Sequence, residues 1–386
     1  MGKIDYIMIE LTDNPMGVYH AGQMVTGHLN LHLSDSLQIK NIRIQLKGGA
    51  YTHWTESNSS KNSSSSDTYE AEECYINQEV VVFGKPEGTT QEKLFLNSGR
   101  HRYNFSFTLP SDCPSSFEDD FYGYIRYFLK GVISRPYKLG TAAKKAFTVI
   151  GLCDLNLDPA NAKSMEQHDG KSLGCLCCVS GQINQDILLA KRGFVPGEVF
   201  DFTVAVHNKS RRRIKKIKAT VIQHVTYRAA HFSFWHTKES ERSLYQDSNC
   251  QVIPEGESRE VVFSNIRIPP APPTIDNCGI IQVSYLLKVE TSPFGPSFSL
   301  DTMLPIVIGT VPLRQHNINN PVRRRLDVIH SHYLLIQTPH LTLSSAIFLS
   351  RSTRFNKIGC LSSVSIKQFL SLKPNFLASR LVSPIT

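Results

Sequence analysis

The stretch Ile39-Lys40-Asn41-Ile42-Arg43-Ile44-Gln45-Leu46 decides the fold, because the chain repeats it as Ile214-Lys215-Lys216-Ile217-Lys218-Ala219-Thr220-Val221. The same offset relates Gly22 to Gly197, each of which stands before an alternating segment. Alternating apolar and polar residues are typical of a half-buried antiparallel strand. The repeat is far longer than a solenoid unit of about 20–50 residues, so it indicates two domains.

A second block is repeated further along the chain, at a somewhat shorter offset. Ile125–Lys130 (IRYFLK) corresponds to Val283–Lys288 (VSYLLK), and the Val-Ile-Gly at 149–151 corresponds to the one at 307–309. The two blocks keep their order, so the sequence predicts a tandem duplication. Because the offset shortens between the blocks, the first copy is the longer one, and it contains the polar tract at 57–66.

The pattern of both copies predicts an all-β protein. Short alternating segments are separated by turn signals such as Asn97-Ser98-Gly99, and no amphipathic helical pattern of three turns stands out. We therefore expect two tandem antiparallel β-sandwiches joined by a short linker. The expected parts are a first sandwich at 5–151, a linker at 152–173, a second sandwich at 174–313, and a basic tail at 314–386 with little packed structure.

The net charge of +9 lies in the last part of the chain. Residues 311–386 hold ten basic residues and one acid, whereas the remainder is formally neutral. Because a nucleic-acid-binding domain usually carries its positive charge on the folded body, we expect no nucleic-acid partner. No uninterrupted apolar run reaches about 18 residues, and the N-terminus lacks the apolar core of a signal peptide. The sequence therefore predicts a cytoplasmic protein without a membrane span.

Signs of catalysis and of cofactors are absent from the sequence. None of the GxxxxGK[ST], HExxH or GxSxG motifs occurs, and the fourteen histidines are dispersed. We therefore expect no enzyme activity and no cofactor. The nine cysteines are an odd, scattered set, which argues against a disulfide framework. For the cluster Cys175-Leu176-Cys177-Cys178, three interpretations are open: thiols at a strand start, palmitoylation, or a zinc site completed by Cys153 and His168. Because a second pair of ligands with zinc spacing is missing, we expect no metal.

The densest basic run is the candidate binding site. It contains six cations: Arg211, Arg212, Arg213, Lys215, Lys216 and Lys218. Clustered Lys and Arg side chains supply charge-assisted hydrogen bonds to anionic lipid headgroups or to an acidic cargo tail. The alternative is a solvated turn and strand start, with Lys216 and Lys218 on the wet face of a sheet.

Arg126 and Lys130 form a second candidate set. Both have the parity of Phe128 along an alternating segment, so they are predicted to project from one face of a strand. Two interpretations are open for them. They belong either to an ion pair with a nearby acid or to a concave face that binds cargo.

Several segments of both copies resemble the arrestin domains of α-arrestins, the arrestin domain-containing proteins. In the first copy, Gly123–Pro136 (GYIRYFLKGVISRP) is similar to the G-x-I-R-Y-x-V-K-A-x-I-x-R-P segment of the arrestin N-terminal domain. The second copy resembles the arrestin C-terminal domain at Cys175–Cys178, Gly181–Ile183, Gly193–Glu198, Asn208–Ser210, Ile268–Pro273, Cys278, Tyr285 and Leu304–Leu313. The resemblance covers residues 5–313 and implies two sandwiches of seven to nine strands.

The resemblance implies a non-enzymatic adaptor of protein transport. Such an adaptor binds the tails of membrane receptors or transporters and links them to endocytic and ubiquitin-dependent trafficking, peripherally at the plasma membrane or endosomes. Many α-arrestins recruit HECT-type ubiquitin ligases through PPxY motifs. This sequence has no PPxY, because Thr274-Ile275 follow the prolines of 269–273. We therefore expect no useful affinity for WW domains, which read such motifs.

The alternative function belongs to a different class. One member of the family sequesters thioredoxin through a mixed disulfide formed by a cysteine of its C-terminal arrestin domain. By that resemblance, this chain would be a regulatory protein that binds a soluble partner, with Cys250 as the candidate redox residue.

Overall fold

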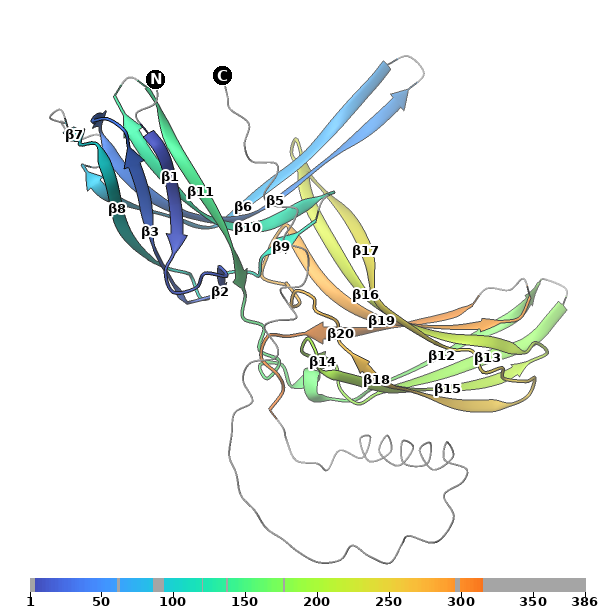
Figure 1. Cartoon of the computed structure of the whole chain (residues 1–386). Coiled ribbons are helices and arrows are strands. Elements are labelled where there is room, and N and C mark those ends of the chain that lie inside the picture. The colour runs from blue at the N-terminus through green and yellow to red at the C-terminus, as the bar shows by residue number, and fades with distance from the viewer. Residues whose placement is uncertain are drawn as a thin grey trace, which may run out of the picture.

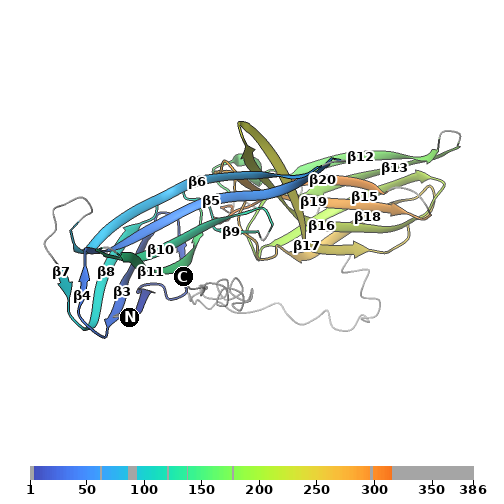
Figure 2. The same cartoon turned by 90° about the horizontal axis from the view of Figure 1, so that it is seen from above.

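The chain folds into two β-sandwiches, as the sequence predicts. The computed structural model describes residues 4–60, 63–85, 94–119, 121–136, 138–175, 178–295 and 299–314. Within these residues it contains twenty strands and one short 3-10 helix, η1 (Pro159–Ala162), which lies between the two sandwiches in the sequence. The sandwiches lie end to end in both views (Figures 1 and 2).

The first sandwich contains β1 to β11. One layer is antiparallel, in the order β1 (Ile4–Leu11), β3 (Met24–Leu33), β8 (Gly99–Thr108). The facing layer runs in the order β6 (Ser63–Gly84), β5 (Asn41–Ser60), β10 (Gly123–Arg135), β11 (Lys138–Ile150), β2 (Val18–His20). Three short strands complete it: β4 (Leu37–Ile39), β7 (Leu94–Leu96) and β9 (Phe117–Glu118). These short strands raise the number above the seven to nine expected. Residues 57–60 and 63–66 of the polar tract pair with each other at the end of the β5–β6 hairpin.

The second sandwich contains β12 to β20. One layer has the order β12 (Met165–Cys175), β13 (Cys178–Leu189), β15 (Val199–Ser210), β18 (Ser258–Arg267). The other has the order β14 (Gly193–Phe194), β20 (Leu300–Ile308), β19 (Ile281–Pro293), β16 (Ile214–His231), β17 (Phe234–Asn249). The two sandwiches correspond to the two copies of the repeat: β10 and β19 hold one repeated block, and β5 and β16 hold the other.

The repeat extends to individual residues. Gly22 and Gly197 have φ angles of +82° and +83°, and each donates its N–H to a carbonyl oxygen, of Pro110 at 3.1 Å and of Ile268 at 2.8 Å. Only glycine adopts such angles at little cost, which explains its presence at both positions. The short strands β2 and β14 also correspond, because each pairs in parallel with the last strand of its sandwich. The two copies therefore share one framework.

Two buried tyrosines anchor equivalent loops. The hydroxyl of Tyr127 donates to the carbonyl oxygen of Pro114 at 2.8 Å, and that of Tyr285 donates to Pro272 at 2.5 Å. In each case the acceptor lies 13 residues earlier in the chain. Burial raises the pKa of both hydroxyls, so both remain protonated donors at neutral pH. Each bond ties an irregular segment to the core of its own sandwich.

The predicted alternation correctly assigns the inward faces. Ile42, Ile44 and Leu46 of β5 are fully buried, and in β16 the equivalent inward set, Ile217, Ala219 and Val221, is also buried. In β10 the side chain of Arg126 is exposed and that of Lys130 half-buried, whereas Ile125, Tyr127 and Leu129 are buried. Burial of the apolar side chains drives this arrangement.

The expected linker at 152–173 is wrong in its second half. Residues 165–173 form most of β12, which pairs along its length with β13. The first half is packed rather than free, because Leu155 and Asn161 are buried and Asp154 bridges to Val311. Asp158 caps η1 by accepting the N–H of Ala160 at 2.9 Å. The polar composition of this segment therefore did not mark a linker outside the sandwiches, because its second half is a paired strand.

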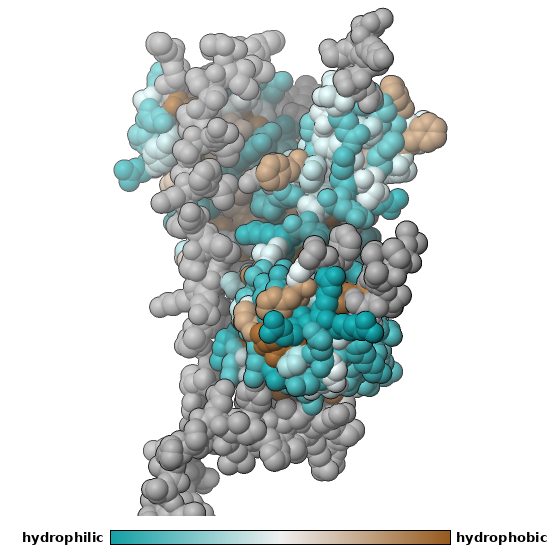
Figure 3. All heavy atoms as spheres, turned by 90° about the vertical axis from the view of Figure 1, so that its right-hand side faces the viewer, coloured by the Kyte–Doolittle hydropathy of each residue, from teal (hydrophilic) through white to brown (hydrophobic). Residues whose placement is uncertain are grey.

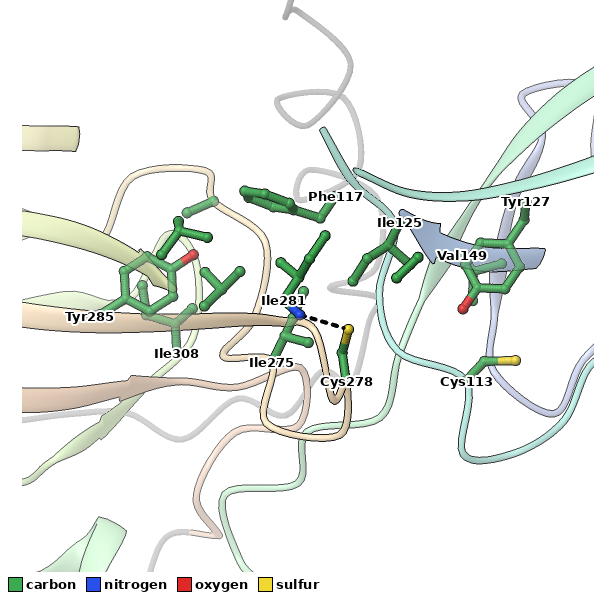
Figure 4. Close-up of a cluster of buried hydrophobic side chains, with 14 of the residues drawn as sticks. Cys113, Phe117, Ile125, Tyr127, Val149, Ile275, Cys278, Ile281, Tyr285 and Ile308 are labelled. Carbon is green, nitrogen blue, oxygen red and sulfur yellow. Dashed lines mark hydrogen bonds between the residues drawn. The ribbon is translucent and has the colours of Figure 1, made fainter. Parts of the chain in front are cut away.

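The two sandwiches share one apolar cluster at their junction. Phe117 and Ile125 of the first sandwich lie beside Ile275 and Ile281 of the second (Figure 4). A single bridge between Ala230 and Glu70 joins the β16–β17 hairpin to β6. The burial of apolar surface at this junction fixes the position of the second sandwich against the first.

Two expectations lie outside the described residues: the nature of the tail from 315 to 386, and the state of the cysteine cluster around 176–177. In the described part of the chain, no helix has the length and apolar character needed to cross a membrane.

Candidate interaction surface

The basic run forms a rigid turn between β15 and β16. Asn208, at the end of β15, donates a side-chain hydrogen bond to the carbonyl oxygen of Arg212 at 2.9 Å, and the Ser210 hydroxyl donates to the side-chain oxygen of Asn208 at 2.6 Å. The N–H of Arg212 in turn donates to the Ser210 hydroxyl at 3.2 Å. Short polar side chains next to a turn commonly fix it in this way. The backbone that carries the three arginines is therefore held in one conformation.

The cations of this turn differ in their availability. Arg211, Arg213 and Lys215 are exposed, while Arg212 and Lys216 are half-buried. None of these five makes an ion pair with another described residue, although Arg213 lies 5.6 Å from the ring centre of Phe294. We name these five residues the basic turn.

Lys218 is different, because its Nζ lies 2.8 Å from the carboxylate of Glu290. That hydrogen bond lowers the pKa of Glu290 and keeps it charged. The charge of Lys218 is therefore neutralised by Glu290, and Lys218 is not among the cations of the predicted run that are available for binding.

The basic turn lies at the far end of the second sandwich. Ser210 pairs with Gly181 at the start of β13, and Ile214 pairs with Pro293 at the end of β19. Figure 3 faces this end of the molecule, where strongly hydrophilic side chains gather beside hydrophobic ones. An exposed cationic surface next to apolar groups suits contact with an anionic, amphipathic partner such as a membrane surface.

Arg126 and Lys130 lie on the other sandwich, so the structure does not bring them to the basic turn. Arg126 makes a bidentate ion pair with Glu118 of β9, with bonds of 2.6 to 2.9 Å, and stacks on the ring of Tyr124 at 3.7 Å. The ion-pair interpretation of Arg126 is therefore confirmed. Lys130 is half-buried and stands directly opposite Lys144 of β11.

Cys250 is exposed and lies at the same end as the basic turn. It follows Asn249, the last residue of β17, which pairs with Ile217. Just beyond it, Ile253 bridges to Ile214. Cys278, by contrast, is buried at the junction of the sandwiches, where burial raises the pKa of its thiol. Of these two thiols, only Cys250 is accessible to a redox partner.

His168, which one interpretation of the cysteine cluster offers as a zinc ligand, is hydrogen-bonded to a carboxylate. Its Nδ1 lies 2.8 Å from Asp186, which also accepts from Nε2 of His207 at 3.1 Å. Within the described ranges, no group of three or more His, Cys, Asp or Glu side chains has metal-binding geometry. The zinc interpretation stays a prediction, because residues 176–177 of its cysteine cluster lie outside the described residues and a carboxylate bound to Nδ1 leaves Nε2 of a histidine able to bind metal.

Local sequence patterns do not predict the polar contacts at the junction of the two sandwiches. Tyr227 of β16 donates to the carboxylate of Asp119, and the N–H of Gly279 donates to Glu73 at 2.8 Å. The partners are 108 and 206 residues apart, so no local pattern signals them.

An exposed aromatic tip lies close to this junction. The alternating segment His231–His236 predicts a strand or an exposed hairpin, and it forms the turn of the β16–β17 hairpin. Phe232, which is 90% exposed, adopts a φ of +53° there. Phe234 and Trp235 beside it are also exposed.

Comparison with known proteins agrees with this architecture. The family model described as "Arrestin (or S-antigen), N-terminal domain" matches residues 7–156, and the one described as "Arrestin (or S-antigen), C-terminal domain" matches 179–313. The chain is 33% identical over 309 residues to arrestin domain-containing protein 17 of Caenorhabditis elegans, covering 78% of this chain and 70% of that protein.

Two further relatives come from mammals. Identity to arrestin domain-containing protein 4 of Mus musculus is 26% over 313 residues, covering 81% of this chain and 73% of that protein. Identity to thioredoxin-interacting protein of Homo sapiens is 25% over 304 residues, covering 77% and 73%. From the two matched domains and these relatives, we conclude that the chain belongs to the arrestin family, among the arrestin domain-containing α-arrestins.

Proposed function

We propose that this protein is a non-enzymatic adaptor that binds the tails of membrane receptors or transporters and links them to endocytic trafficking. Members of the arrestin family generally act as adaptors or regulators, and both arrestin domains are present here. The proposed location is the cytoplasm, with peripheral binding at the plasma membrane or endosomes.

The basic turn is the observation that carries this proposal. Five cations without an ion-pair partner among the described residues stand on a conformationally fixed turn at an exposed end of the molecule. Anionic lipid headgroups and acidic segments of cargo tails are the groups that such a turn binds, through charge-assisted hydrogen bonds. Arg126 contributes less to binding in this proposal because Glu118 already neutralises it. Lys130, on the first sandwich, is a secondary binding residue in this proposal.

Recruitment of a HECT-type ubiquitin ligase would need a route other than PPxY, because the sequence lacks that motif. We expect purified full-length protein not to bind isolated WW domains of such ligases in a titration. Micromolar affinity for a WW domain would contradict this expectation, because these domains need an extended proline motif with its tyrosine.

A second candidate function is supported by the placement of Cys250. This exposed thiol lies beside the basic turn, and one relative is named thioredoxin-interacting protein. In this alternative, the protein sequesters a soluble protein that carries a disulfide: the Cys250 thiolate attacks one sulfur of that disulfide and bonds to it, and the other sulfur leaves as a thiolate.

One experiment separates the two functions. The full-length protein is used as bait for detergent-solubilised membranes and for cytosol, in reducing and in non-reducing buffer. An adaptor should retain membrane proteins in both buffers, and the Cys250→Ser variant should behave like the wild type. Capture of a cytosolic protein that is lost on reduction and with Cys250→Ser would instead support sequestration. Retention of no membrane protein in either buffer would overturn the adaptor proposal.

A further inference from the structure

A hollow of about 300 Å³ lies on the outer face of the second sandwich. It belongs to the layer β12–β13–β15–β18, on the opposite side of the sandwich from the layer that carries the β16–β17 hairpin (Figure 1). Ala205 of β15 lines it, and this residue pairs on one side with Asp186 of β13 and on the other with Glu260 of β18. Paired residues project from the same face of a sheet, so two carboxylates flank the small side chain of the alanine. Two strand spacings, about 10 Å, separate their backbones.

Thr203 adds a neutral polar group to the hollow. It lies two residues before Ala205 on the same strand and therefore on the same face of the sheet. It is only 2% exposed, and its hydroxyl has no hydrogen-bond partner among the described residues. Buried hydroxyls are normally paired, so an unpaired one that borders a hollow indicates that a ligand supplies its partner.

The charge of the hollow is negative. Glu166 of β12 lines it together with Asp186 and Glu260. Glu260 is exposed and has no ion-pair partner within the described ranges. Arg259 also lines the hollow, but its Nη1 donates to the carbonyl oxygen of Val252 at 2.9 Å. Three carboxylates around a single committed arginine favour a cationic ligand.

Two histidines hold the carboxylate of Asp186 in place. Nδ1 of His168 lies 2.8 Å from one of its oxygens, and Nε2 of His207 lies 3.1 Å from the other. Nδ1 of His207 lies in turn 2.8 Å from the hydroxyl of Ser258. These bonds run across all four strands of the layer. Each carboxylate oxygen accepts more than one hydrogen bond, so both oxygens still have a lone pair for a ligand. Because the carboxylate is already fixed, a ligand loses little free energy in ordering it.

Comparison of the two copies shows that the shared framework does not need the hollow. The first ten residues of β3 and β15 have the same order of buried and exposed positions. In this alignment Thr203 and Ala205 correspond to His28 and Asn30, whose side chains are larger. Among the described strands, β12 with its Glu166 has no counterpart in the three-stranded layer β1–β3–β8. Small side chains and an added strand thus distinguish the second copy, which favours a binding role over a structural one.

We propose that the hollow binds the side chain of an arginine from an extended segment of a partner protein. A guanidinium group is planar and has five N–H donors, so it can donate to Asp186 on one side, to Glu260 on the other and to the hydroxyl of Thr203. Its aliphatic stem would lie against Leu188 and Ala205, which line the hollow. The ammonium group of a lysine is compact and reaches one of the two carboxylates at a time, so the site should prefer arginine.

Saturation-transfer NMR with the full-length protein tests the preference for arginine. The probe is the peptide acetyl-GGRGG-amide, used at about pH 8 so that the histidines are mostly neutral. Three hydrogen bonds, two of them charge-assisted, predict a Kd of about a millimolar, with the strongest transfer to the protons of the arginine side chain. Lysine in place of the arginine should weaken binding about fivefold, and the neutral citrulline about tenfold or more. Equal binding of the three peptides, or no detectable binding of the arginine peptide, would overturn the proposal.

Three variants locate the site. Glu260→Gln should weaken binding of the arginine peptide about tenfold, because a charge-assisted hydrogen bond is lost. Thr203→Val keeps the shape of the side chain and removes the hydroxyl, so it should weaken binding about threefold. Glu241→Gln is the matched control, because it removes the same charge from an exposed position of β17 in the other layer, and it should leave the affinity unchanged.

Thermal unfolding of each variant separates binding from stability. Because the side chain of Glu260 is exposed, its replacement should leave the unfolding temperature unchanged. Equal weakening by Glu260→Gln and Glu241→Gln would mean that only net charge matters and would overturn the proposal. Unchanged affinity of a folded Glu260→Gln variant would overturn it as well.

Discussion

The basic turn makes a quantitative prediction about membrane binding. Arg211, Arg213 and Lys215 are its three exposed cations, and none has an ion-pair partner among the described residues. Each cation close to an anionic surface contributes about 1 kcal/mol. Replacing all three with alanine should therefore weaken binding by about 3 kcal/mol, or about a hundredfold. Because Asn208 and Ser210 already hold the turn, little of this energy is spent on ordering the backbone.

Sedimentation with vesicles of phosphatidylcholine, with and without phosphatidylserine, measures this loss. The matched control replaces Arg100, Lys144 and Lys145, three exposed cations of the first sandwich, and so removes the same charge. Both variants keep the basic residues after 311, so the difference between them reports on the turn alone. The wild-type advantage should shrink as salt shortens the Debye length from about 8 Å at 0.15 M to about 3 Å at 1 M.

Two results would refute the reasoning. Equal losses in both variants would mean that only net charge matters, and no loss in either would mean that the turn is a solvated strand start. Because all three side chains are exposed, thermal unfolding should change little, by less than about 0.5 kcal/mol. Unfolding of the variant would show instead that the turn has a structural role. Lys218→Ala should affect binding least, since Glu290 already neutralises that lysine.

Three further changes test the framework. Gly197→Ala should destabilise the protein by about 1–2 kcal/mol in urea unfolding, because its φ of +83° disfavours a Cβ. Nothing lies within 4 Å of the position that this Cβ would take, so the expected cost is conformational and not steric. An unchanged urea midpoint would contradict the conformational explanation. Tyr285→Phe should cost about 1 kcal/mol, because the carbonyl of Pro272 loses its donor, and an unchanged Tm would refute this. Asp186→Asn should lower the pKa of His168 in an NMR titration, because the hydrogen bond to Asp186 raises it. Identical titration curves in the two proteins would refute the contact. The bond stabilises the fold at pH values below the ordinary histidine pKa, and this stabilisation is lost as pH rises through the pKa of His168 in the folded protein.

The repeat and the inward faces were predictable because they depend on local sequence. Alternation at 42–46 and at 217–221 places apolar side chains at every second position, and burial selects the strand that uses this pattern. The ion pair of Arg126 was within reach for a similar reason, because Glu118 lies only eight residues earlier in the chain. The alternation and an ion pair between residues close in sequence can be predicted without knowing which strands become neighbours.

The second half of the expected linker shows where prediction from local sequence fails. In β12, Glu166, Gln167 and His168 are all exposed, so the strand has almost no apolar alternation to detect. It forms because β13 offers a complete row of backbone partners. Pairing of this kind satisfies the backbone groups whatever the side chains are, and a polar composition therefore does not exclude a strand.

Whether a cation of the basic run has an ion-pair partner also depends on contacts between residues far apart in the sequence. Lys218 and Glu290 are far apart in the sequence and meet because β16 lies beside β19. The sequence alone treats all six cations of the run as equivalent. Only the sheet order separates the neutralised lysine from the basic turn.

Comparison of the two copies, in the alignment that places Ile39 on Ile214, then separates structural cations from cations that the fold does not need. Lys218 corresponds to Arg43, and each lies near a glutamate of a neighbouring strand, Glu290 at 2.8 Å and Glu79 at 3.6 Å. A charge kept in both copies and paired in both belongs to the framework. Arg211–Arg213, however, correspond to Ser36-Leu37-Gln38, which carry no charge although the first sandwich folds on the same framework. Since the framework forms without these three arginines, their presence in the second copy is better explained by binding than by stability.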